Sequence, residues 1–453
     1  MRAMAGFRWG WFVPAVAALA LGAYAVVPSG GVPQGPAAAA AEPSWVHVKL
    51  TPAHATSTLA AYQAAPLFAG RADPIRGAWY RIEVATPGEA ARLAARLRDD
   101  PTVASAFVAP HVEPAVIHTR MARTADRSCP ISTPSYAPLQ GYLGPAPAGI
   151  DAPSAWARPG GRGQGVSFAD IEGAWNLGHE DIPTERMEHV GGRTIRDRHW
   201  EAHGTAVVGV VAARDNDIGM VGIAPEVDRV LVSAIGRIGP AAAIDRAQAA
   251  LAPGDVLLIE LHGIGPRNRF IPMEYWDDVY DIIKLATDRG VIVIEAAGNG
   301  GEDLEHRIYR GVFDRNQRDS GAILVGAGAP ARPGYADRSR LWFSNYGSRV
   351  DVQGWGYKVA TFDYGDLQDC SAHDRKYTDE FAGTSSASPI VAGAALVLQG
   401  IYKAAHHGDL LSPRAMRDLL RRTGTPQTDG PEGPAAEQPI GPRPDLARAI
   451  EQL

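Results

Sequence analysis

The 453-residue chain has few cysteines, no long run of basic residues and no internal repeat. Two cysteines allow at most one disulfide within the chain. The formal net charge of −6 is spread along the sequence, which excludes the basic surface of nucleic-acid-binding proteins and of polybasic membrane-binding proteins. We therefore expect no nucleic-acid partner, whereas a protein or peptide partner remains open.

The composition is that of a globular protein, with 45% hydrophobic and 21% charged residues, and the length exceeds one average domain. Four regions are expected along the chain. They are an N-terminal segment over 1–41, a small unit over 42–115, a linker with surface loops over 116–149, and a larger domain over 150–453.

The N-terminal segment has the order of a secretory signal peptide. Arg2 and Arg8 precede an apolar stretch over residues 9–27, and a run of small residues follows at 37–41. This order predicts cleavage and a secreted protein. The alternative is an uncleaved anchor that holds the protein on the outside of the membrane, because about 19 apolar residues are near the lower limit for crossing a bilayer. A membrane partner is expected only in that case.

Export would bring Cys129 and Cys370 into an oxidising compartment, where they could form a disulfide. Two free buried thiols are the alternative.

The small unit carries both strand and helix patterns. Residues 45–50 and 79–84 alternate apolar with polar side chains, as half-buried strands do, and 103–108 is a further short strand. Thr86 and Glu89 form a capping box that predicts the start of a helix. We therefore expect a small α+β unit.

The larger domain alternates short apolar runs with helical segments. The runs lie at 256–261, 291–297 and 322–326, and their side chains are apolar on both faces. Such strands predict a mostly parallel sheet flanked by helices, which is the α/β fold class. Further helices are expected over 412–420 and 445–453.

Ser385 lies in a segment of small residues, 383–389, just before an apolar helical run over 390–398. Pro389 is tolerated because the first turn of a helix has amides without intrahelical partners. The unpaired amides and the helix dipole favour negative charge, which an oxyanion develops during acyl transfer. The alternative is a serine that only caps the helix.

His203 opens a second predicted helix, in which small residues such as Gly209 permit close packing on the sheet. A lone histidine is more often structural, so its interpretation depends on its partners.

Asp170 ends a short apolar strand that begins at Gly165. Catalytic residues of open α/β sheets gather at the carboxyl ends of strands. Glu172 is the local competitor, and Asp170 is preferred because it directly ends the predicted strand.

The three segments, in the chain order Asp170, His203 and Ser385, resemble those of the subtilisin-like serine peptidases, the subtilase family. A fourth segment, 291–300, resembles the family's strand that leads to the oxyanion-hole asparagine, here Asn299.

The resemblance covers roughly residues 150–425 and implies a serine endopeptidase that needs no cofactor for catalysis. We expect it to be secreted and monomeric. Ser385 would attack the peptide carbonyl, and His203 would take up and return its proton. Asp170 would orient the imidazole, and Asn299 would help to bind the oxyanion.

Two other functions compete with this interpretation. A non-catalytic secreted binding protein on a subtilase scaffold would be indicated by a lost triad member, and none is lost. The serine-carboxyl peptidases use glutamate and aspartate in place of histidine, and the intact segment around His203 argues against them.

The sequence departs from the family where a strand rich in serine and glycine is expected to bind substrate. Residues 257–263 stand there instead and include Glu260, and Glu295 lies near the end of a neighbouring strand. The two acids predict either a pocket that favours basic substrate side chains or carboxylates that are held by backbone amides or cationic partners away from the substrate.

Two further features follow from the resemblance. The unit over 42–115 stands where subtilases carry a prodomain that assists folding and inhibits the enzyme, with a permanent accessory domain as the alternative. Residues 179–181 and 214–219 resemble a structural calcium site, matching at Asp181 and Asn216, although such loops also occur as plain turns.

Overall fold

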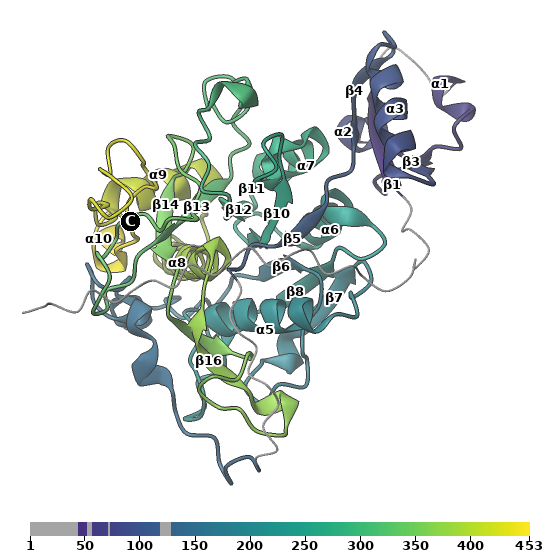
Figure 1. The fold of residues 1–453 in the computed structure, drawn as a ribbon. Coiled ribbons are helices and arrows are strands. Elements are labelled where there is room, and N and C mark those ends of the chain that lie inside the picture. The colour runs from purple at the N-terminus through teal and green to yellow at the C-terminus, as the bar shows by residue number, and fades with distance from the viewer. Residues whose placement is uncertain (1–43, 52–56, 71–72, 118–127) are drawn as a thin grey trace, which may run out of the picture. The chain divides into compact units, whose positions relative to one another are not determined.

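A computed structural model describes residues 44–51, 57–70, 73–117 and 128–453 (Figure 1). The expected signal peptide or anchor over 1–41 lies outside the described residues.

The first described unit is an antiparallel sheet in the order β2-β3-β1-β4, with helices beside it. Its elements are β1 (Ser44–Leu50), α1 (Ser57–Ala60), β2 (Ala65–Pro66), α2 (Pro74–Ala78), β3 (Trp79–Val84), α3 (Pro87–Arg98) and β4 (Val103–Val108). The Thr86 hydroxyl accepts a hydrogen bond from the Glu89 amide at 3.2 Å, so the predicted helix start is confirmed. The predicted strands are confirmed as well.

The larger unit is built on a parallel sheet in the order β14-β13-β12-β9-β6-β8-β7, so the α/β prediction is confirmed. The strands are β6 (Phe168–Glu172), β7 (Met187–Gly191), β8 (Val230–Ala234), β9 (Val256–Ile259), β12 (Ile292–Ala296), β13 (Ile323–Gly328) and β14 (Val352–Trp355). A helix lies in the crossover between β7 and β8 and in that between β9 and β12.

Helices cover both faces of this sheet. One face carries α4 (Ala152–Trp156), α5 (Arg198–Ala212), α8 (Thr384–Ala405), α9 (Pro413–Thr423) and α10 (Leu446–Ile450). The other carries α6 (Gly239–Ala250) and α7 (Asp277–Asp288). α5 packs beside β6, and α8 packs on β12, β13 and β14 (Figure 1). Of the helices in the described ranges, α8 alone has the length and hydropathy to cross a membrane, but its apolar window is fully buried in the core.

Two small antiparallel sheets complete the described fold. One has the order β11-β10-β5 and joins Phe270–Pro272, Leu261–Ile264 and Val112–Pro114. The other pairs β15 (Val359–Phe362) with β16 (Tyr377–Phe381).

Part of the stretch over 116–149, for which we expect a linker with surface loops, packs on the larger unit. Tyr142 is fully buried in the core of the larger unit, and its hydroxyl donates to the Ala360 carbonyl at 3.0 Å. Cys129 and Cys370 form a disulfide, which settles the alternative between a bond and free thiols. This stretch is therefore part of the larger domain.

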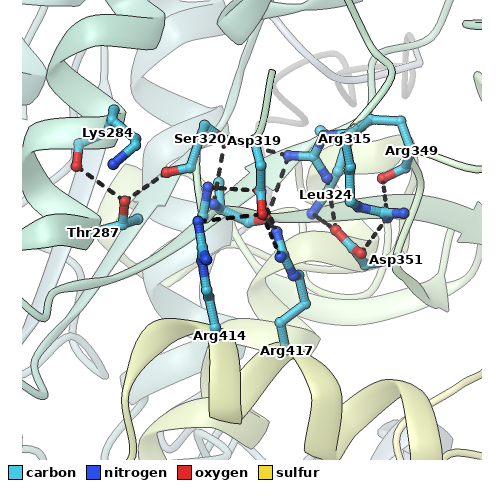
Figure 2. Close-up of polar contacts among 12 residues, drawn as sticks. Lys284, Thr287, Arg315, Asp319, Ser320, Leu324, Arg349, Asp351, Arg414 and Arg417 are labelled. Atoms are coloured by element: carbon cyan, nitrogen blue, oxygen red, sulfur yellow. Dashed lines mark hydrogen bonds and ion pairs between the residues drawn. The ribbon is translucent and has the colours of Figure 1, made fainter. Parts of the chain in front are cut away.

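A network of ion pairs lies next to α9 and includes Arg417, Asp319, Arg349 and Asp351 (Figure 2). Arg349 is fully buried and bonds to Glu274 at 2.6 Å and to Asp351 at 2.7 Å. Arg417 of α9 bonds to Asp319 at 2.8 Å. Every charge in this set has a partner of opposite sign, and such pairing is what allows charges to be buried. We interpret the network as structural.

Candidate active site

The predicted histidine lies on α5 and is fully buried. The helix begins at Arg198, earlier than expected, because the Asp197 carboxylate accepts hydrogen bonds from the His199 and Trp200 amides and caps it there. The expectation that His203 opens the helix is therefore wrong. His203 lies in the second turn, where its side chain faces the end of β6.

The carboxylate that meets His203 belongs to Glu172. Glu172 Oε1 lies 2.5 Å from His203 Nδ1, and both side chains are fully buried. Asp170 instead accepts a hydrogen bond from Trp175 Nε1 at 2.8 Å. The choice of Asp170 over Glu172 is therefore wrong. From the sequence, Asp170 is preferred because it ends the predicted strand, but β6 runs two residues further and ends at Glu172.

Burial controls the ionisation of this pair. It raises the pKa of Glu172 well above its usual value, although a hydrogen bond from the Gly173 amide acts in the opposite direction. Burial also lowers the pKa of His203 to about 3. Burial therefore disfavours charge on either side chain.

Ser385 lies in the first turn of α8 and is fully buried. Ser385 Oγ and His203 Nε2 have no hydrogen-bond partner among the described residues. Both are therefore available to a group that enters the site. Gly383 caps the helix with φ 127°, and a Cβ there would lie 2.4 Å from the Ala115 carbonyl oxygen. A side chain at this position would exclude the chain that approaches Ser385.

Asn299 follows β12, and its amide has a defined orientation. Its Oδ1 accepts hydrogen bonds from the amide and the hydroxyl of Thr384, each at 2.9 Å. This leaves Nδ2, which is buried and has no partner in the described ranges, as a free donor next to the first turn of α8.

The segment over 112–117 crosses this site, which sequence reasoning did not detect. β5 pairs antiparallel with β10, and the Ala115 amide donates to the Glu260 carbonyl at 3.0 Å. The Ser385 amide then donates to the Ala115 carbonyl at 3.1 Å, and the Ile117 amide donates to the Ala382 carbonyl at 3.1 Å. The carbonyl of Ala115 is thus held by the backbone of the predicted nucleophile.

Glu260 and Glu295 do not line one pocket. Glu295 lies on β12, and its Oε1 accepts a hydrogen bond from the Glu274 amide at 2.8 Å, as the backbone-bound alternative predicted. Glu260 contacts the hydroxyl of Ser388 on α8 at 2.7 Å. The side chains of Glu260 and Glu295 therefore bind different parts of the fold.

The predicted calcium ligands lie together. Asp181 is fully buried, and its Oδ2 accepts a hydrogen bond from the Met220 amide at 2.9 Å. Burial raises the pKa of Asp181 to about 7, and the hydrogen bond from the Met220 amide acts in the opposite direction. Its Oδ1 has no partner among the described residues. An unpaired buried carboxylate oxygen fits a cation ligand.

The model of the subtilase family matches residues 181–441, which is more than half of the chain. The chain therefore belongs to the subtilase family. The match begins after β6, so it does not include Glu172 or Asp170.

Known relatives agree with this assignment. The chain is 28% identical over 289 residues to the intracellular serine protease of Paenibacillus polymyxa, which spans 60% of this chain and 78% of the relative. It is 27% identical over 251 residues to Subtilisin Savinase of Lederbergia lenta, spanning 55% and 81%. The chain is a subtilisin-like serine endopeptidase, and its substrates are proteins or peptides.

A solved structure shows the same fold. Fervidolysin of Fervidobacterium pennivorans, a keratinolytic enzyme related to subtilisin, aligns with a TM-score of 0.58 and 18% identity. The alignment covers 90% of this chain and 61% of fervidolysin.

Proposed function

We propose that the enzyme cleaves peptide bonds through an acyl-enzyme on Ser385, with His203 as general base and Glu172 as the carboxylate behind it. The observation that carries this proposal is the Ala115 carbonyl, which accepts a hydrogen bond from the Ser385 amide at 3.1 Å. We expect the carbonyl of a substrate to make the same bond, which supports the proposal.

The reaction follows from these positions. Ser385 Oγ attacks the carbonyl carbon, and its proton passes to His203 Nε2. Glu172 accepts from Nδ1, which sets the tautomer with a free Nε2 and stabilises the imidazolium. The imidazolium then protonates the leaving amine, and water hydrolyses the acyl-enzyme by the reverse proton transfers.

Asn299→Ala is expected to lower kcat by about a hundredfold to a thousandfold with little change in KM. The free Nδ2 donor would meet the oxygen only when negative charge develops on it, so the loss falls on the transition state. Steady-state kinetics on a peptide substrate measure both constants. A loss confined to KM would contradict this role.

We further propose that the unit over 44–115 is a prodomain. It is bound to α7 by polar contacts, with His47 2.7 Å from Asp278 and Lys49 2.6 Å from Asp281. Its last residues occupy the site described above. A covalently attached segment there would block other substrates, which supports a role as inhibitor rather than as permanent accessory domain.

The enzyme should cut its own chain between Ala115 and Val116, because the Ala115 carbonyl is the one that faces the Ser385 amide. Intact-mass measurement and N-terminal sequencing of mature enzyme from the culture medium should place the new N-terminus at Val116. A mature N-terminus at another residue would contradict the assignment, and an enzyme that retains residues 44–115 would favour an accessory domain.

Recovery from the medium also tests secretion, which we propose from the disulfide between Cys129 and Cys370, a bond typical of exported proteins. Active enzyme found only inside the cells, with both thiols free, would contradict it. Cys129 lies after the proposed cut, so the bond stays within the mature chain. A monomer is proposed for the mature enzyme, and size-exclusion chromatography would test it.

We also propose a calcium ion at Asp181 and Asn216. An ion that binds only the folded protein stabilises it by mass action, so excess chelator should lower the unfolding temperature without changing kcat at low temperature. An unchanged unfolding temperature, with no calcium found by elemental analysis, would leave these loops as plain turns.

A further inference from the structure

Glu260 contacts both the segment over 112–117 and helix α8, which carries Ser385. It lies between β9 and β10, and its backbone carbonyl accepts the hydrogen bond from the Ala115 amide. Its side chain is fully buried and reaches α8, where Oε1 lies 2.7 Å from Ser388 Oγ. The family resemblance does not account for an acid at this position.

The protonation of Glu260 can be inferred by counting hydrogens. Ser388 Oγ also lies 2.7 Å from the Thr384 carbonyl oxygen, which cannot donate. The single hydroxyl proton of Ser388 can satisfy one of these two contacts. Both contacts are hydrogen bonds only if Glu260 carries its own proton and donates it to Ser388, which donates to Thr384.

The surroundings agree with a neutral acid. Among the ion pairs of the described residues, none includes Glu260. Burial raises its pKa well above the usual value, and repulsion from the carboxylates of Asp170 and Glu172 on β6 raises it further. The other titratable groups nearby are His203 on α5 and His262 on β10, and burial lowers the pKa of each to about 3. No cation therefore compensates an ionised Glu260.

Hydrogen bonds lead from Ser388 through Thr384 to Asn299, and Thr384 precedes Ser385. Thr384 accepts from Ser388 and donates from its amide and hydroxyl to Asn299 Oδ1. Ser385 is the next residue in the same turn.

We propose that Glu260 is a positioning residue that works as a neutral acid, donating to Ser388 and so holding the first turn of α8 and Asn299 against the bound peptide. This rests on the proposed role of Ser385. Ionisation of Glu260 would break the donated bond and place negative charge beside the developing oxyanion. Activity should be full while Glu260 is neutral and should fall as the pH rises through its raised pKa.

The test is the pH profile of kcat for the mature enzyme and for Glu260→Gln. Glutamine keeps the shape and a donor but cannot ionise, so kcat at neutral pH should stay close to the wild-type value and the alkaline decline should disappear. Glu260→Ala should lower kcat by about a hundredfold, as small misplacements of reacting groups do, with little change in KM.

Glu295→Gln is the matched control, because Glu295 is also a fully buried glutamate with a raised pKa, but its side chain bonds to the Glu274 amide and not to α8. Its pH profile should match that of the wild type. The proposal is overturned if Glu260→Gln keeps the alkaline decline, or if it loses activity as Glu260→Ala does, since the carboxylate itself would then be needed. Failure of a fluorophosphonate to label Ser385 would instead overturn the proposed nucleophile.

Discussion

Glu172→Gln should lower kcat by about 10⁴-fold, the size of effect that follows when a triad carboxylate becomes an amide. The Gly173 amide donates to Glu172 Oε2 at 3.0 Å, so the glutamine oxygen would take that bond and its NH₂ group would face His203. Nδ1 would then have to accept, and the proton would move to Nε2. An imidazole protonated at Nε2 cannot take the proton of Ser385.

Asp170→Asn is the matched control, two residues earlier on the same strand face. Its side-chain oxygen can still accept the hydrogen bond from Trp175 Nε1, so kcat should stay close to the wild-type value. Steady-state kinetics on both mature variants decide between the two acids. A large loss in Asp170→Asn with little loss in Glu172→Gln would restore the first choice and contradict the geometry.

Ser385→Ala should abolish peptidase activity, with a loss of about 10⁶-fold in kcat. The hydroxyl oxygen is the atom that forms the acyl bond, and no other hydroxyl takes its place. The precursor should fold and keep residues 44–115 attached, because the cut between Ala115 and Val116 needs the same oxygen. Gel analysis and mass measurement of the purified variant would show the uncut chain.

Ser386→Ala is the control for Ser385→Ala, from the same turn of α8. Ser386 Oγ contacts the carbonyl oxygens of Trp355 and Gly383, each at 3.0 Å, and so faces away from the proposed chemistry. This variant should remain an active, self-processing peptidase. Equal loss of activity in both variants would mean that the turn, not the hydroxyl of Ser385, was disrupted.

Much of the fold could be predicted from local patterns. The alternation of residues 79–84 and the capping pair of Thr86 and Glu89 each depend on near neighbours, and both predicted elements form. The apolar runs at 256–261 and 291–297 contain central strands of the parallel sheet. Such patterns record burial and capping, which act over a few residues.

The choice between Asp170 and Glu172 could not be made from local patterns. Both side chains point to the same side of β6 because they are two residues apart, and only the last residue of the strand reaches His203. The strand end is set by pairing with β8, in which Glu172 lies opposite Ala234. A shift of two residues in the predicted end of β6 therefore decides whether Asp170 or Glu172 is expected to meet His203.

The contacts of residues 112–117 and of Glu260 also could not be predicted from the sequence. Ala115 meets Ser385 across 270 positions of the chain, and nothing in its neighbours marks it as a ligand of the site. The sequence marks Glu260 as an unusual acid, but its contact with Ser388 depends on the packing of α8 against the sheet. Long-range pairing of this kind depends on the assembled tertiary structure.

The most direct test of the central claim is the rate at which a fluorophosphonate labels the mature enzyme, with the modified residue mapped by peptide mass spectrometry. We expect the label on Ser385, at a similar rate in the wild type and in Asp170→Asn, and a severe loss of labelling in Glu172→Gln. Labelling of another residue, or a rate that depends on Asp170 and not on Glu172, would contradict a Ser385, His203 and Glu172 triad.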